Sequence, residues 1–280
     1  MPPTVSCVIR FHDDAQRVAR LVRLVRPHVD EVLCAADAGM SEEELAVVAG
    51  AADVRLVRIP YRQPLERATA YLLGQCLGDW ILRLEGDEVP STGLLEQLGA
   101  LVGDRAHAAY SVPRPWLWPD RHSLLAQRPW WPDYQLRLMR NDLSLLDVTG
   151  GSHGYIRSAA PRRNLETPLY HAALIVEGRA EREAKVRRYD AVRADWTIVG
   201  RPFNEAYYFP EAYESLAVRP VADADLVLLD EVLGADGPPL PRPRAQPAPR
   251  ARSPRSTRSG LCGRGARPTT GRTSRSSSPT

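Results

Sequence analysis

Lysine is almost absent from this chain. Lys185 is the single lysine among 280 residues, so nearly all of the positive charge is arginine, which we interpret as a coding bias of the source. Cysteine is also scarce, and its four positions form no CxxC pair and no metal-ligand spacing. Cys7 and Cys34 lie in strand-like apolar runs, which predicts buried free thiols in a reducing compartment.

Long apolar runs are missing as well. No apolar stretch is long enough to cross a bilayer. The first strand-like run begins at Val5, which leaves no room for a signal peptide. We therefore expect a cytoplasmic protein.

Acidic residues are absent after Asp236, where ten arginines lie between Arg242 and Arg275. The whole chain carries a formal charge of +3, but residues 1–236 hold 27 basic and 34 acidic residues, a net charge of −7. An acidic folded part argues against a nucleic-acid groove. The last stretch is rich in Pro, Arg and Ser and has too few apolar residues to offset ordering entropy. We predict a folded domain over 1–235 and a disordered tail over 236–280.

The tail leaves two interpretations open. Its arginines favour weak, salt-sensitive contact with an anionic surface such as the inner face of the membrane. The tail contains no aromatic residue that could stack on bases. A shifted reading frame near the end of the gene would also produce such a segment. No specific nucleic-acid partner is expected.

Strands and helices alternate in the first hundred residues. Strand-like runs at Val5–Arg10, Glu31–Ala36, Val54–Ile59 and Asp79–Glu85 are each followed by a helix-start signal, namely Asp13 or Asp14, Ser41, Pro64 and Ser91. This alternation predicts an α/β fold with a mostly parallel sheet that helices cover on both faces. Ligands of such sheets bind at the carboxyl ends of the strands.

Three carboxylates follow the fourth of these strands. Glu85, Asp87 and Glu88 stand within four residues, and clustering like charges is costly unless a cation neutralises them. Asp87 and Glu88 at a strand end suit Mg²⁺ or Mn²⁺ and the diphosphate that such an ion bridges. A solvated acidic turn before the Ser91 helix is the competing interpretation.

The middle of the chain interleaves tryptophan with proline. Residues 113–133 contain four Trp and five Pro, and proline excludes helix and central strand. We expect a surface loop, where binding residues concentrate.

Several segments together resemble family 2 glycosyltransferases of the GT-A fold. Val5–Ile9 with Arg10–Asp14 resembles the family's opening strand and nucleotide loop, and Val32–Gly39 resembles its second strand. Glu85-Gly86-Asp87-Glu88 stands in the place of the Asp-x-Asp motif. The stretch from Trp130 to Leu138 is similar to a subgroup that adds sugars to lipopolysaccharide-core-like acceptors. The resemblance covers about residues 4–230.

The resemblance implies roles for individual residues. Arg10, Asp14, Asp37, Arg67 and Glu85 would contact the nucleotide sugar, and Asp87 and His153 would hold the divalent cation. Asp13 and Asp14 also fit helix caps, and Arg67 also fits a solvated helix face. His171 fits a core histidine. Glu85 in place of Asp and Gly154 in place of the subgroup's Glu are departures from the pattern.

The acceptor side is expected around residues 130–133. Trp130 and Trp131 offer flat rings for the apolar faces of a sugar, and Asp133 is the candidate general base. Asp133 as a turn residue after Pro132 stays open as the alternative.

The function implied is metal-dependent, inverting transfer of a sugar from a nucleoside diphosphate to the hydroxyl of a glycan, a lipid-linked acceptor or a small molecule. Two alternatives remain. A nucleotidyltransferase needs a Gly-rich loop after its first strand, which Arg10–Asp14 lacks. A non-catalytic carbohydrate-binding or scaffold protein on a decayed fold is favoured by Glu85 and Gly154.

Overall fold

A seven-stranded sheet forms the centre of the folded unit. The computed structural model describes residues 1–59, 65–147, 156–191 and 196–234. The strand order is β11-β6-β8-β4-β1-β2-β3, in which β4, β1, β2 and β3 run parallel and β8 runs antiparallel to β4 and β6. The strands are β1 (Val5–Phe11), β2 (Glu31–Asp37), β3 (Arg55–Ile59), β4 (Trp80–Glu85), β6 (Ala109–Pro113), β8 (Tyr134–Arg140) and β11 (Arg162–Asn164).

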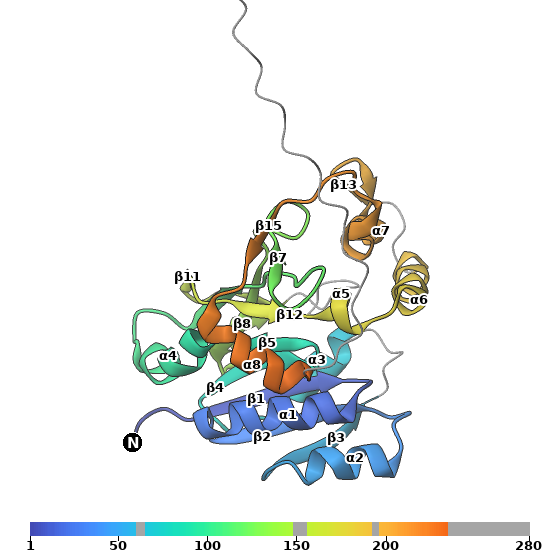
Figure 1. Cartoon of the computed structure of the whole chain (residues 1–280). Helices are drawn as coiled ribbons and strands as arrows, with labels where there is room; N and C mark the ends of the chain where they lie inside the picture. Colours follow the sequence, from blue (N-terminus) through green and yellow to red (C-terminus); the bar gives the residue numbers. More distant parts are fainter. Residues whose placement is uncertain (60–64, 148–155, 192–195, 235–280) are drawn as a thin grey trace, which may run out of the picture. The chain divides into compact units, whose positions relative to one another are not determined.

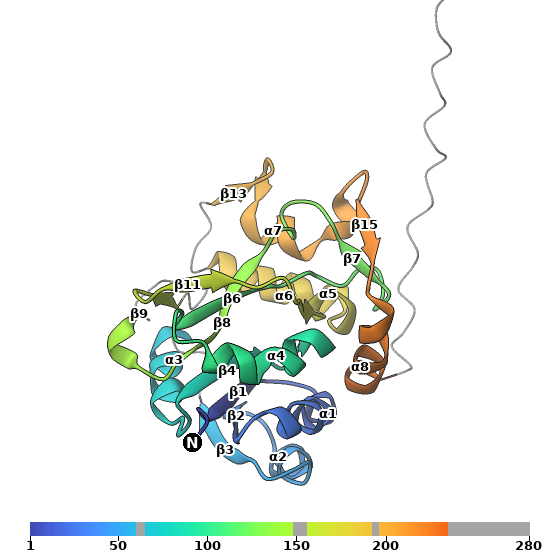
Figure 2. The ribbon, with the colours of Figure 1, turned by 90° about the vertical axis from the view of Figure 1, so that its left-hand side faces the viewer.

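Alternate residues of each central strand face opposite layers. In β1, Cys7 and Ile9 belong to one hydrophobic core, whereas Val8 belongs to the other. Four helices cover the first face and one covers the second (Figures 1 and 2). The first four are α1 (Ala15–Val25), α2 (Glu42–Ala49), α4 (Thr92–Gly103) and α8 (Asp223–Leu233), with the short η1 (Arg26–His28) after α1, and the fifth is α3 (Leu65–Gly74). The predicted α/β fold with a mostly parallel sheet is confirmed.

The helix starts follow the capping residues. Asp14 caps α1 through a hydrogen bond from the Arg17 backbone N–H. Ser41 caps α2 in a reciprocal capping box with Glu44, and Ser91 caps α4. These side chains satisfy N–H groups that a helix cannot pair internally, which is why the sequence marks the starts so clearly.

The Trp- and Pro-rich segment corrects one expectation. Trp116, Trp118 and Trp130 are buried, and they pack against the later helices in a third hydrophobic cluster. The segment 113–133 is therefore largely interior, and not the surface loop that its prolines predicted. Three tryptophans bury so much apolar area that long-range packing outweighs the local preference for a loop.

The remaining strands are short. The strands are β5 (Glu88–Pro90), β7 (Ser123–Leu125), β9 (Leu146–Asp147), β10 (Arg157–Ser158), β12 (Leu169–His171), β13 (Thr197–Ile198), β14 (Arg201–Pro202) and β15 (Val218–Pro220), which form two-stranded pairs. The helices are α5 (Ala173–Val176), α6 (Arg179–Asp190) and α7 (Phe203–Tyr208), with single turns at η2 (Leu143–Leu145) and η3 (Pro210–Ala212).

Two sequence predictions concern cysteine and the membrane. Cys7, Cys34 and Cys76 are free and buried, as expected for Cys7 and Cys34, and burial raises the pKa of the Cys34 thiol to about 12. Within the described part of the chain, no helix combines the length and apolar character needed to span a bilayer.

Candidate active site at the carboxyl edge of β1 and β4

Two adjoining cavities open beside the carboxyl ends of β1 and β4. The arginine cavity has a volume of about 130 Å³ and is lined by Arg10, Arg83, Glu85, Asp87, Arg114, Trp116, Asp133, Gln135, Arg137, His171, Lys185, Tyr189, Phe203, Asn204, Tyr207 and Tyr208. The loop cavity, of about 60 Å³, lies along the β1–α1 loop and is lined by Arg10–Asp13, Arg17, Glu85–Asp87, Val176, Glu177, Lys185 and Tyr189. One water needs only ~10–15 Å³, so the arginine cavity has room for part of a ligand.

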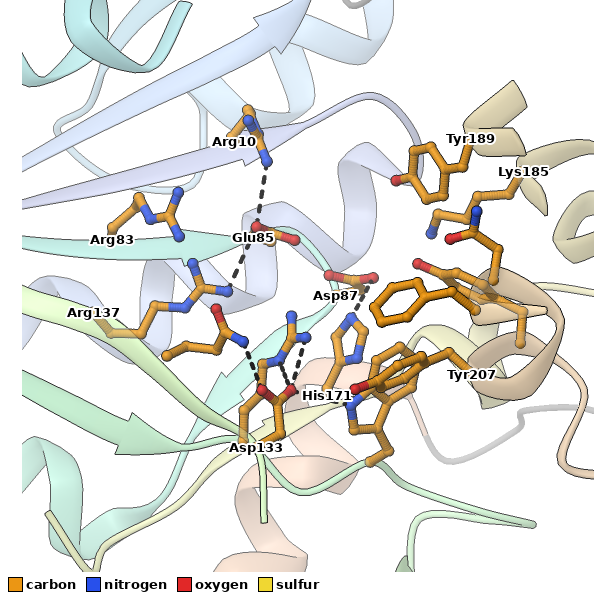
Figure 3. A pocket seen from close by; sticks show the side chains of 16 residues that line it. Arg10, Arg83, Glu85, Asp87, Asp133, Arg137, His171, Lys185, Tyr189 and Tyr207 are labelled. Atoms are coloured by element: carbon orange, nitrogen blue, oxygen red, sulfur yellow. Dashed lines mark hydrogen bonds and ion pairs between the residues drawn. The ribbon is translucent and has the colours of Figure 1, made fainter. Parts of the chain in front are cut away.

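A cluster of two carboxylates and an imidazole stands where the cavities meet. Glu85 ends β4, Asp87 follows it, and His171 ends β12; ligand atoms of the three lie within 4.8 Å of one another. The His171 Nε2 atom is 3.3 Å from Asp87 Oδ2 (Figure 3). Burial opposes ionisation of Asp87, but the neighbouring His171, Lys185 and Arg17 hold its pKa well below its usual range.

Strand register brings Arg10 beside Glu85. The two residues are Cα partners in the parallel pairing of β1 with β4, and Arg10 Nη2 lies 3.2 Å from Glu85 Oε1. Arg137 from β8 approaches the same oxygen at 3.5 Å. Burial opposes ionisation of Glu85, but Arg137 and Arg10 keep the pKa of this carboxyl well below its usual range.

Glu88 differs from the prediction that paired it with Asp87 as a metal ligand. Its side chain is fully buried and is ion-paired with Arg137 and, at 3.3 Å, with Arg114. Because β5 turns this residue into the interior, the third member of the cluster that could hold a metal ion is His171, from β12 paired to β5.

Asp133 lines the arginine cavity. Its carboxylate accepts hydrogen bonds from Arg114 Nε at 3.0 Å, Gln135 Nε2 at 2.6 Å and Trp116 Nε1 at 3.4 Å. Burial would raise the pKa of Asp133, but Arg114 and these hydrogen bonds lower it. The carboxylate is thus ionised and fixed in position.

Lys185, the single lysine, faces both cavities from α6. It is buried, and its ammonium group is ion-paired with Glu177. Burial opposes its charged form, yet Tyr208, Glu177 and Asp87 together raise the pKa of Lys185 well above its usual range.

The structure brings some of the predicted residues together and separates others. Arg10, Glu85, Asp87 and Asp133 all line the arginine cavity. Asp14 and Asp37 line neither cavity: Asp14 caps α1, and Asp37 accepts a hydrogen bond from the Gly39 N–H at the end of β2. The Arg67 side chain and all of His153 lie outside the described residues.

The predicted acceptor tryptophans do not line the cavity. Trp130 is fully buried, and its Nε1 donates to the Tyr207 carbonyl, so its ring is not presented to a sugar and the predicted contact needs correction. Trp131 is half-buried under the Arg219 guanidinium, and its acceptor role stays a prediction. Trp116 takes the place beside Asp133 that the sequence assigned to these two rings.

Sequence reasoning missed the cationic side of the site. Arg83 and Arg137 each interrupt an apolar strand, Trp80–Glu85 and Tyr134–Arg140, and charged residues in buried strands require partners. That signal was available. The positions of Arg114, His171 and Lys185 depend on long-range packing, which no local pattern encodes.

Comparison with known proteins gives a family. The model of glycosyl transferase family 2 matches residues 6–162, and no curated protein matches. Similar solved structures include a mannosyltransferase from Pyrobaculum calidifontis in complex with GDP-Man and Mn²⁺, at 15% identity and a TM-score of 0.43, covering 67% of this chain and 61% of that one. They also include S. aureus TarS 1–349 with UDP-GlcNAc, at 10% identity and a TM-score of 0.44, covering 69% and 68%. A mycobacterial protein aligns at 13% identity and a TM-score of 0.42, covering 78% and 84%.

This chain thus spans about three fifths of the Pyrobaculum protein's length. The family match extends from β1 into β11 and includes Arg10, Glu85, Asp87 and Asp133, so this chain belongs to glycosyl transferase family 2.

Proposed function

We propose that this chain transfers a sugar from a nucleoside diphosphate to an acceptor hydroxyl. The observation that carries the proposal is the Glu85–Asp87–His171 cluster, which lies at the strand edge where both cavities meet. In this arrangement the diphosphate half of the donor lies at the loop cavity, and the sugar and the reacting hydroxyl of the acceptor lie at the arginine cavity. Open parallel sheets bind ligands at this edge.

The donor atoms of the cluster fit a divalent cation. Two carboxylates and one imidazole suit Mn²⁺ better than Mg²⁺, because Mg²⁺ favours oxygen ligands alone. Glu85, Asp87 and His171 would hold the ion, and when bound it would neutralise charge on the departing diphosphate. His153, the ligand implied by the resemblance, remains a candidate for the same ion.

The chain's own residues supply the other parts of the reaction. Lys185 and Arg10 line both cavities and place positive charge beside the diphosphate. Asp133 accepts the proton of the acceptor hydroxyl as the new bond forms between the acceptor oxygen and the anomeric carbon. The bond from that carbon to the diphosphate oxygen breaks, and the diphosphate leaves. Because the mechanism has one base and a single displacement, the anomeric configuration inverts. The anomeric configuration of the product, compared with that of the donor, tests this.

The acceptor is a glycan, a lipid-linked molecule or a small molecule. Contact between the arginine-rich tail and an anionic surface also belongs to the proposal, as does contact of Asp14, Asp37 and Arg67 with the nucleotide.

The test is binding of UDP and GDP, measured by calorimetry on the full chain with and without Mn²⁺, followed by release of nucleoside diphosphate from its sugar donor. Asp87→Asn is expected to abolish Mn²⁺-dependent binding, whereas the exposed Asp53→Asn keeps it. Mn²⁺-dependent binding that survives in Asp87→Asn contradicts the cation site. Nucleotide binding with no turnover under any condition supports the carbohydrate-binding alternative instead.

A further inference from the structure

The charged groups around the arginine cavity form an alternating chain. Three cations and three carboxylates contact one another in sequence, so the chain is electrically neutral. Its members in order are Arg10, Glu85, Arg137, Glu88, Arg114 and Asp133, joined at 3.2 Å, 3.5 Å, a closer contact, 3.3 Å and 2.9 Å. Each carboxylate contacts at least one guanidinium, and the chain has no net negative charge to balance a further cation.

Arg83 is that further cation. It lies on β4 two residues before Glu85, on the same face of the strand, and lines the arginine cavity. Among the described residues its side chain has no hydrogen bond or ion pair, and its Nε atom is buried without a partner. Figure 3 shows its guanidinium between those of Arg10 and Arg137.

Arg137 adds donors of its own. Its Nη2 atom serves Glu85 and Glu88, but its buried Nε and Nη1 have no partner in the part of the chain that the structure describes. Buried donors without acceptors are costly, and a guanidinium presents its donors in a planar fork that matches a carboxylate or a phosphate. The guanidiniums of Arg83 and Arg137 line the same cavity, and an anion bound there would accept their unpaired donors.

We infer that Arg83 and Arg137 bind a carboxylate or phosphate group carried by the sugar half of the reaction. Arg83 lines the arginine cavity and not the loop cavity, so its ligand is not the diphosphate assigned to the loop cavity. The group belongs either to the acceptor or to the transferred sugar, and the inference rests on the proposed function for that division. It narrows the substrates to sugar acids or sugar phosphates.

Calorimetry on the full chain separates the two sources. The acceptor arm titrates glucuronate and glucose 6-phosphate, with glucose as the neutral reference, both alone and with UDP and Mn²⁺. The donor arm compares UDP-glucuronate with UDP-glucose. The variants are Arg83→Gln and, as a matched loss of one surface guanidinium, Arg105→Gln.

We expect an anionic probe to bind at least about tenfold more tightly than its neutral counterpart in one arm. Arg83→Gln should remove that preference while leaving UDP affinity within about twofold, and Arg105→Gln should retain it. Equal affinities for anionic and neutral probes in both arms overturn the inference, as does a preference that survives in Arg83→Gln. Since the free sugar acids are also titrated without nucleotide, failure of UDP to bind would count against the proposed function and not against this site.

Discussion

Asp133 is the carboxylate of the arginine cavity that lies outside the Glu85–Asp87–His171 cluster. Glu85 and Asp87 belong to that cluster, so Asp133 is the carboxylate to which the proposed mechanism assigns the role of general base. Its hydrogen bonds to Arg114 and Gln135 fix the direction of its lone pairs. The lowered pKa makes it a weaker base but keeps it ionised over the whole neutral range.

Asp133→Asn is therefore expected to lower kcat by ~10²–10⁴-fold while nucleotide affinity is retained, because a base acts in the transition state. Steady-state kinetics and calorimetry measure the two quantities. Asp142→Asn is the matched control, since Asp142 caps η2 and does not line the cavity. Near-normal turnover in Asp133→Asn would move the base elsewhere.

Glu88 has a structural role that the acidic motif conceals. Its fully buried carboxylate lies between Arg114 and Arg137 and also accepts the Glu85 backbone N–H at 3.0 Å. Breaking a buried pair leaves uncompensated charge and costs ~3–5 kcal/mol.

We expect Glu88→Gln to lower the free energy of unfolding by that amount in a denaturant titration. Glu42→Gln removes an exposed pair with Arg58 and should cost at most ~1 kcal/mol. Comparable losses in the two variants would show that Glu88 is not a structural anchor.

The motif Glu85-Gly86-Asp87-Glu88 shows what the local sequence can and cannot predict about side-chain roles. Its position after a buried strand predicted carboxylates at the carboxyl edge of the sheet, and Glu85 and Asp87 line both cavities there. The division of labour within it was not predictable, because Glu88 turns inward only through the pairing of β5 with β12 and the two buried arginines. The same pairing delivers His171, whose partner Asp87 lies 84 positions earlier in the chain.

At the scale of elements, periodicity and capping residues were sufficient for the parallel half of the sheet. β1, β2, β3 and β4 each begin and end within one residue of their predicted bounds, because buried parallel strands are short apolar runs. The prediction of a surface loop for the tryptophan segment was wrong because burial there depends on contacts distant in sequence. Its prolines describe only the local chain, whereas its burial depends on α5, α6 and α7, more than forty residues later.

The start of α1 follows the β1–α1 loop, which lines the loop cavity. Asp14 adopts a left-handed conformation, with φ of 40°, and its Oδ1 accepts the Arg17 backbone N–H at 2.9 Å. Asn tolerates that backbone and caps equally well, whereas Ala does neither. The two substitutions therefore separate the cap from the charge.

Asp14→Ala should lower the free energy of unfolding by about 1–3 kcal/mol, and Asp14→Asn by much less. Chemical denaturation measures both, and UDP and GDP titrations of Asp14→Asn show whether the charge also contacts the donor. Equal destabilisation by Ala and Asn would contradict the capping role. An unchanged nucleotide affinity in Asp14→Asn would remove Asp14 from the predicted donor contacts.

At the scale of the whole molecule, the candidate site includes residues that lie beyond the sequence range of the family match. The match ends at residue 162, yet His171 of β12 and Lys185 of α6 line the arginine cavity. The two cavities therefore need the later third of the folded part, which also supplies the aromatic wall of Tyr207 and Tyr208.

Residues up to α8 also close the hydrophobic core. Leu229 and Val232 of α8 are fully buried against the sheet layer, and Arg20 Nε donates to the Val232 carbonyl at 2.8 Å. Asp225 accepts hydrogen bonds from Tyr170 Oη and from the Thr92 backbone N–H. The domain boundary predicted from composition, near Asp236, comes directly after these contacts.

Two truncations test that boundary. A chain ending at Asp236 keeps α8 and should melt at the full-length Tm within error, since the removed composition offers almost no apolar area to bury. A chain ending at Val221 loses α8 and the burial of Leu229 and Val232, and its Tm should fall on the order of 10 °C. Thermal melts of the two proteins, each with and without UDP and Mn²⁺, measure the difference. A large loss in the longer truncation would place packed structure within the arginine-rich segment and move the boundary beyond 236.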